Sequence, residues 1–468
     1  MILKTLSKEF KESFRNGKAK IAFSIVVILL FTSVWLSMQK YNNANKEYLK
    51  ATESERHIWD NQGEKNPHSA AHYGTYAFKP KQPLSLIDKG VDKYVGTTIF
   101  LEAHYRNEAQ FSAAADQTGT SRFGELTPDF ILLFLIPLLI ILLGYNIFTK
   151  EKEQGTLFLL KSSGASINQL TLGKWLSLFI PIFLCTTIVF IIAGILLSNL
   201  NDYGTFSWTS LISMWSIYIG FYIVFINIVM LISYVSKRSG LSLVIALSVW
   251  IFTCLVTPKI ASTLAENKYP YPTRQEFQAM VTKDKKQGLD GHNTWNEEAQ
   301  LLKEKVLKEY KVDSLHQLPF NFDGYRMQKG EEYQAAIYSK HYNNLKAQYE
   351  NQNKTYKTLA AISPFLPTRF LSMSIAQTDY ATHWHFSDAA EQYRIQTQKF
   401  LNDNFAQNSV FGDWKYKADS STWSALPQFN YTPQSLSTII DTNKSYLIIL
   451  GLWVLLSFST LYLTIKLK

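Results

Sequence analysis

Cysteine is scarce in this chain of 468 residues, which contains only two, Cys185 and Cys254. Both lie within long apolar stretches, so disulfide bonds cannot hold the polar parts of the chain together, even in an oxidising compartment. We interpret both as small apolar packing residues.

The usual sequence patterns of catalytic sites are also lacking. The phosphate-binding motif Gly-x4-Gly-Lys-Ser/Thr is not met at Gly173-Lys174. Asn168 stands where the motif has its first glycine, and Trp175 stands where it has serine or threonine. No Ser/His/Asp or paired-carboxylate arrangement stands out by its spacing. The chain is therefore predicted not to be an enzyme and to bind no cofactor of its own.

Charged residues are absent from six apolar runs, and this absence is the strongest signal in the sequence. Each run is close to the ~17–25 residues that cross a bilayer as a helix. A soluble helix of that length would show a polar face, and a proton-coupled carrier would normally need charged groups within the membrane. The predicted membrane-spanning helices are residues 21–38, 130–149, 176–198, 211–235, 240–257 and 446–465.

Lysine and arginine concentrate on one side of these predicted spans. They occur in residues 1–20, in 150–175, between the fourth and fifth spans, and in the tail, whereas the short loop 199–210 has none. By the positive-inside rule, both termini are predicted to be cytoplasmic. The segments on that side account for the whole net charge of +10, so no basic stripe remains for nucleic-acid binding.

Two long polar segments, 39–129 and 258–445, are predicted to lie outside the membrane as a mainly helical extracytoplasmic domain. Apolar residues at three- and four-residue spacing predict helices at Glu297–Tyr310, Glu331–Tyr356 and Ser387–Phe405. Between the last two, residues 359–376 are apolar but interrupted by prolines. We interpret this stretch as a re-entrant or interfacial element at the outer mouth; a buried loop of the outer domain is the alternative.

Two features mark the predicted cytoplasmic side. Residues 1–20 repeat an apolar residue every fourth position with lysines between, which predicts an amphipathic helix on the membrane surface that ends near Gly17. In 150–175, a charged helical turn and a glycine precede a short apolar stretch, Leu157–Leu160. An apolar tip exposed to the cytosol favours a partner with a matching groove; a plain loop resting on lipid headgroups is the alternative.

The segment Lys150–Lys174 resembles the membrane subunits of ABC transporters, in particular the type-two export class of permeases. Its Glu-x-Glu pair, Gly-Thr, Leu-rich turn and Leu-Gly-Lys match that class's coupling helix. The resemblance implies an all-α permease subunit of the bacterial cytoplasmic membrane that pairs with a second permease copy or paralogue. A separate ATPase subunit would bind ATP and Mg²⁺. The implied ATPase-coupling residues are Glu151, Glu153, Gly155, Thr156, Leu157, Phe158, Leu159, Leu160 and Lys174. The implied outer-gate residues are Ser363, Pro364, Phe365 and Pro367.

The outer segments resemble a subfamily of bacterial permeases with large outer loops and no assigned substrate. The resemblance rests on stretches such as His68–Pro80, Arg122–Pro128, His383–Phe386 and Ala389–Arg394. Large outer loops leave a second interpretation open: an ATP-driven mechanotransmitter that acts on a periplasmic protein without moving cargo. An ATP-independent scaffold or receptor is a third.

All nine histidines fall in the predicted outer segments. His68 and His72 are four residues apart, and His383 and His385 are two apart. These four imidazoles could form a copper, zinc or haem-handling site, which would suit a metal- or haem-related transporter. Capping or packing near the membrane surface is the alternative.

Overall fold

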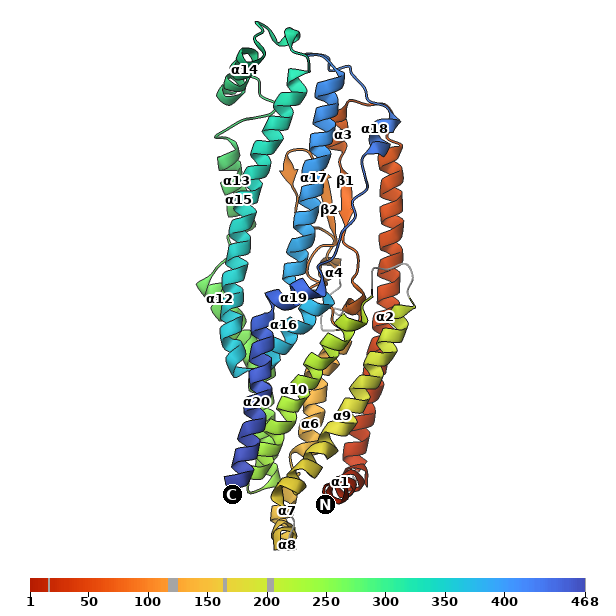
Figure 1. Ribbon diagram of the computed structural model, residues 1–468, viewed down its shortest axis with the longest axis vertical. Coiled ribbons are helices and arrows are strands. Elements are labelled where there is room, and N and C mark those ends of the chain that lie inside the picture. Colours follow the sequence, from red (N-terminus) through yellow and green to blue (C-terminus); the bar gives the residue numbers. More distant parts are fainter. Residues whose placement is uncertain (16, 117–124, 163–165, 200–205, 468) are drawn as a thin grey trace.

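The computed structural model describes residues 1–15, 17–116, 125–162, 166–199 and 206–467. The molecule is elongated and mainly helical, with an apolar helical bundle at one end and a polar half at the other (Figure 1). We use "polar half" for the described residues of 39–127 and 269–443. Both chain termini lie at the bundle end.

The prediction of six helices long and apolar enough to cross a membrane is confirmed. They pack around a core of buried aliphatic and aromatic side chains, in which α10 is the most enclosed helix. The bundle elements are α2 (Gly17–Asp60), α5 (Pro128–Phe130), η3 (Ile131–Leu135), α6 (Ile136–Gly144), α9 (Ile167–Ser198), α10 (Trp208–Val235), α11 (Ser239–Trp250), η4 (Ile251–Val256), α12 (Thr257–Lys268) and α20 (Lys444–Leu467).

The first of these helices does not end at residue 38, where the predicted loop began. α2 continues without a break to Asp60, a length of about 66 Å at 1.5 Å per residue, roughly twice the hydrocarbon thickness of a bilayer. No glycine or proline interrupts its second half. Tyr41, Asn45 and Trp59 are buried there at helical spacing against the polar half, which is why this polar stretch remains helical.

Proline reshapes the second apolar helix. Pro137 cannot donate a backbone hydrogen bond, and the turn before it, η3, is a π-helix, in which bonds run five residues back. The carbonyl five residues before Pro137, that of Leu132, accepts instead from the Tyr222 hydroxyl of α10 at 3.1 Å. A hydroxyl from a neighbouring helix thus satisfies the orphaned carbonyl inside the apolar core.

The polar half is built on two long antiparallel helices, α15 and α17, which pack along each other. The helix predicted at Glu297–Tyr310 is confirmed with the same bounds, whereas those predicted at Glu331–Tyr356 and Ser387–Phe405 are longer than expected. The elements here are α3 (Pro67–Tyr73), η1 (Pro83–Leu86), α4 (Ala113–Asp116), α13 (Arg274–Lys285), α14 (Glu297–Tyr310), η5 (Leu315–Gln317), α15 (Phe322–Leu359), η6 (Ala360–Ile362), α16 (Phe365–Ala376), α17 (Tyr380–Asn408), α18 (Ser420–Ala425) and α19 (Leu436–Thr442).

The all-α prediction missed one small sheet in the polar half. Strands β1 (Thr75–Phe78), β2 (Thr98–Glu102) and β3 (Tyr105–Arg106) form an antiparallel three-stranded sheet in that order. Ala77 pairs with Ile99, and both are buried in a cluster with Phe386 and Ala390 of α17. The strands are too short for their alternation to stand out in the sequence.

Candidate functional site

The predicted coupling segment folds as two short helices at the end of the bundle. α7 (Thr149–Glu153) is followed by Gly155, and α8 (Thr156–Ser162) projects beyond the other helices next to the termini (Figure 1). Gly155 has φ +70°, a left-handed conformation that glycine adopts without steric cost. This glycine allows the chain to turn sharply from α7 into α8.

Four consecutive side chains fasten α7 to four different elements. Lys150 pairs with Glu12 of α1 (Ile2–Arg15) at 2.8 Å, and its hydrogen bond lowers the pKa of Glu12. Glu151 accepts from Lys8 at 2.7 Å and lies 3.2 Å from Lys174 of α9. The other two contacts are to the ends of the neighbouring helices, where Lys152 donates to carbonyls after α10 and Glu153 accepts from the first residue of α11.

The contact made by Glu153 caps a helix. Its carboxylate accepts from the backbone N–H of Ser239 at 2.7 Å and from the Ser239 hydroxyl at 2.9 Å, where a negative charge is favoured by the helix dipole. Glu151 is buried. Both glutamates were grouped with the docking residues on the strength of the resemblance, but their side chains are committed to contacts inside the chain.

Two large apolar side chains of α8 are exposed. Phe158 and Leu159 are 74% and 64% exposed, whereas Leu157 is buried toward the chain and Leu160 is half-buried. Two adjacent large apolar side chains exposed on one helix are typical of a helix that inserts into a groove. The structure thus separates the predicted stretch into an anchor, α7, and an exposed apolar tip, α8.

Lys174 lies deeper than the resemblance implied. It sits within α9, which begins at Ile167, and its side chain is 1% exposed. Its Nζ is 2.5 Å from Glu9 Oε1 and 2.8 Å from the Ile147 carbonyl oxygen. Helix α1 crosses tightly over this point, since a Cβ on Gly173 would lie 2.7 Å from Thr5 Cβ. Lys174 therefore joins α1, α7 and α9.

The predicted outer-gate residues lie on and before α16, which packs against α10 and α20 at the junction of the bundle and the polar half. Ser363, Pro364, Phe365 and Pro367 are all buried. With 12 residues, α16 is too short to cross a bilayer. It is a buried helix rather than a buried loop.

Ser363 bonds to a proline-disrupted turn, as Tyr222 does. Pro258 follows the π-helical turn η4, and the carbonyl five residues before it, that of Thr253, accepts from the Ser363 hydroxyl at 2.8 Å. The fifth apolar helix is thus tied to the start of α16 by a bond that the proline makes available.

A buried ion-pair network beside Ser363 had not been predicted. Arg369 of α16 lies 3.0 Å from Asp88 and 2.8 Å from Asp129. Ser372 donates to Asp88 at 2.5 Å and contacts the Tyr218 hydroxyl at 2.8 Å. Complete burial raises the pKa of Asp88, against the opposing charge of Arg369. No sequence signal brings these residues together, because Arg369 and Ser372 lie between 240 and 284 positions from the two aspartates that they contact.

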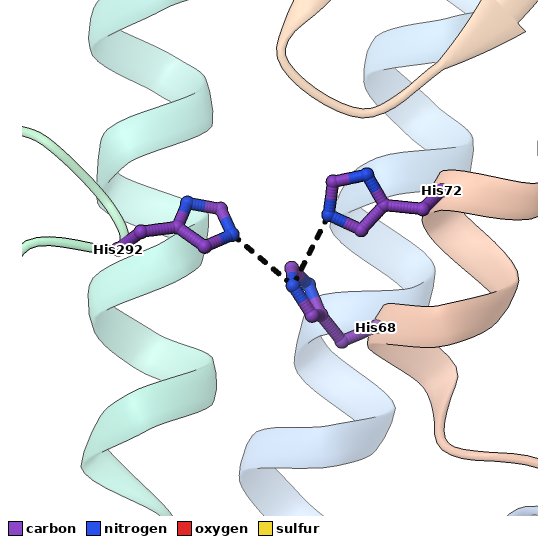
Figure 2. A group of neighbouring side chains, drawn as sticks. All are labelled: His68, His72 and His292. Atoms are coloured by element: carbon purple, nitrogen blue, oxygen red, sulfur yellow. Dashed lines mark hydrogen bonds between the residues drawn. The ribbon is translucent and has the colours of Figure 1, made fainter.

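The four histidines predicted as a metal site are not brought together. His68 and His72 of α3 instead meet His292, from the loop before α14 (Figure 2). His385 hydrogen-bonds the Tyr431 hydroxyl at 2.9 Å, and His383 stacks on Tyr380. The structure thus places the first pair beside a third histidine and the second pair elsewhere, and metal binding by His68 and His72 stays a prediction.

Comparison with known proteins gives one family match. The profile of a domain of unknown function (DUF3526) matches residues 274–432, which run from α13 past α18 in the polar half. No curated protein matches the chain. The match and the six apolar helices are compatible with a membrane protein.

Proposed function

We propose that this chain is the permease subunit of an ATP-driven ABC transporter of the type-two export class. A separate ATPase subunit binds ATP and Mg²⁺ and docks on α8. The observation that carries the proposal is the exposed apolar pair Phe158 and Leu159 on a helix whose base is fixed by four neighbouring elements. A push on such a helix reaches α1, α9, α10 and α11 together.

The charge distribution supports a cytoplasmic position for α8. The lysines of α1 and α7 lie at the same end of the bundle as both termini, and the positive-inside rule assigns this end to the cytoplasm. In this orientation the polar half is extracytoplasmic and the host membrane is the bacterial cytoplasmic membrane. A second copy or a paralogue completes the pathway, as the class resemblance implies.

Movement of the bundle by the ATPases would open an outward path between the two permease subunits. Helix α16 lies where such a path would leave the bundle, and its burial against α10 and α20 makes it the proposed outer gate. The cargo is a small or lipid-like molecule in this proposal.

A mechanotransmitter is the second candidate, and the length of α2 favours it. A helix of 44 residues passes without interruption from the bundle into the polar half, where its end lies beside α18 (Figure 1). Its end is fixed there, since the Trp59 indole donates to the Trp423 carbonyl at 3.1 Å. A displacement of α2 in the bundle would reach the polar half and a periplasmic protein bound to it. The two candidates differ in what stimulates the ATPase. Cargo stimulates the ATPase of a transporter, whereas the periplasmic protein stimulates that of a mechanotransmitter.

Charge substitution at the tip tests the docking step. The double variant Phe158→Glu/Leu159→Glu changes only exposed side chains, so the fold should persist. Trp295→Glu is the matched control, because Trp295 is 87% exposed in the polar half. Each variant is purified in detergent from the native host, and the co-purifying proteins are identified by mass spectrometry.

We expect an ABC ATPase to co-purify with the wild type and with Trp295→Glu. The double variant should lose it. Absence of an ATPase from well-folded wild-type protein would refute the proposal and favour a scaffold. Retention of the ATPase by the double variant would refute α8 as the docking element.

A further inference from the structure

Three imidazoles converge at the far end of the polar half, from two segments that are distant in the sequence. His68 and His72 lie one turn apart on α3, and His292 comes from the loop before α14 (Figure 2). Their Nε2 atoms face one another: that of His68 is 3.2 Å from that of His72 and 3.1 Å from that of His292. One ligand atom of each histidine lies within 4.8 Å of the others.

These separations are those of ligands around one small metal ion. A Zn–N bond of about 2.0–2.1 Å in a tetrahedral site places neighbouring nitrogens about 3.3 Å apart. Two of the three nitrogen pairs already have that spacing. The third pair lies within 4.8 Å and would have to close to that spacing around a bound ion.

Hydrogen bonding alone does not account for the arrangement. A neutral imidazole nitrogen offers either one hydrogen or one lone pair, never both. Nε2 of His68 faces two other ring nitrogens, so it can make one good hydrogen bond and must leave the other nitrogen poorly matched. A shared cation accepts the lone pairs of all three nitrogens at once.

The imidazoles are held in the form that binds metals. Burial, and then the neighbouring histidines, lower the pKa of His68 to about 3. Partial desolvation of their rings, and then the neighbouring imidazole of His104, also lower the pKa values of His72 and His292, although both residues remain open to solvent. Neutral rings are the ligand-competent form. Because His72 and His292 are exposed, an ion can enter from solvent.

A fourth imidazole, that of His104, lies beside the three and contacts the carboxylate of Glu331. Its ring centroid is 4.4 Å from that of His292 and 5.1 Å from that of His72. Its Nδ1 is 2.5 Å from Glu331 Oε1, and Glu331 is bonded in turn to Arg394. Carboxylates in this position commonly orient the histidines of metal sites.

The backbone of His104 is held in an uncommon conformation. It has φ +67° in the turn between β2 and β3, a conformation that is unfavourable for a residue other than glycine. Its N–H donates to Glu331 at 2.8 Å. Its Nδ1 touches Glu331 without a well-aligned hydrogen bond, and its buried Nε2 has no hydrogen-bond partner among the residues that the structure describes. An unpartnered buried nitrogen beside three converging ones is a second observation that points to a ligand.

We propose that His68, His72 and His292 bind one divalent first-row transition-metal ion, Zn²⁺ or Cu²⁺, with His104 as the adjoining fourth imidazole. Imidazole nitrogen suits both ions. The ion would clamp the segment that carries α3 and the sheet to the loop before α14. The site is independent of the docking of an ATPase, so either proposal can fail without the other.

The test is metal titration of the full-length, tag-free protein in detergent after removal of metal with a chelator. Calorimetry with Zn²⁺ should show one equivalent bound per chain. His68→Gln and His292→Gln each remove a ligand, so each should weaken binding by more than the roughly 10–100-fold that loss of a supporting residue costs. His385→Gln is the matched control, because His385 is a half-buried histidine of the same half that bonds Tyr431, and it should bind like the wild type.

Two further readouts keep the result decisive if a variant is unstable. X-ray absorption at the zinc edge should count at least three imidazole ligands. Zn²⁺ should raise the melting temperature of the wild type and of His385→Gln, but not that of His292→Gln, which lies in a surface loop. Binding of less than one equivalent, fewer than three imidazoles, or equal losses in His68→Gln and His385→Gln would each overturn the proposal.

Discussion

Replacement of Lys174 by methionine tests whether a buried cation holds the base of the coupling segment. Methionine preserves much of the length and apolar volume of the lysine side chain and removes only its charge. In the wild type, Lys174 Nζ lies 2.5 Å from Glu9 and 3.2 Å from Glu151. Both carboxylates would remain at positions with little access to water.

The size of the loss follows from that burial. Removing one partner of a buried pair typically costs 3–5 kcal/mol, because the other charge is left uncompensated. Glu151 keeps Lys8 as a partner at 2.7 Å, so we expect the lower end, about 3 kcal/mol. A surface pair costs at most about 1 kcal/mol. Lys444→Met is therefore the control, since Lys444 and Asp441 are 70% and 80% exposed.

The chain carries its own reporter of unfolding. Cys185 and Cys254 lie in apolar helices, and Cys254 is buried, so a thiol-reactive fluorogenic dye labels the protein as it opens on heating in detergent. At roughly 2 °C per kcal/mol, Lys174→Met should melt about 6 °C below the wild type. Adding Glu9→Gln removes one unpaired charge and should recover part of that loss.

Two results would refute this reasoning. If Lys174→Met and Lys444→Met melt within a degree of each other, the buried cation contributes no more than an exposed one. If the double variant Glu9→Gln/Lys174→Met is no more stable than Lys174→Met, lost packing rather than unpaired charge accounts for the change.

Two other ion pairs give predictions at the junction of the bundle and the polar half. Arg369→Met leaves Asp88 and Asp129 without their shared cation, so it should destabilise by about 3 kcal/mol or more in the same dye assay; a loss below about 1 kcal/mol would contradict a buried pair. Burial alone would raise the pKa of Glu125, but Lys89 and a second lysine lower it to about 2 from 4.5. Such a group stabilises the fold above pH 4.5 and loses that contribution as the pH falls toward 2, so Glu125→Gln should be less stable than the wild type at pH 6 and should approach it at low pH. A constant difference between the two proteins across that range would exclude this titration.

The six long apolar helices could be predicted because their signal is local. The length of an uncharged run can be read directly from the sequence and compared with the thickness of a bilayer. The six predicted runs all lie within six apolar helices of the structure. The apolar stretch after Gly155 was a local signal too. The extension of α2 to Asp60 was missed because its second half is polar. Which of its residues are buried depends on the segments of the polar half that pack against it, and the sequence does not show that packing.

The sequence by itself determined the six apolar helices, the uneven distribution of lysine and arginine among the segments between them, and the apolar Leu-Phe-Leu-Leu stretch, because each depends on residues close together in the chain. Only the tertiary structure decided which charges are buried and which histidines meet. Lys174 reaches Glu9, Arg369 reaches Asp88, and His68 reaches His292 across 165, 281 and 224 positions. Spacing along one chain carries no information about such pairs, because their distance is set by how the helices pack.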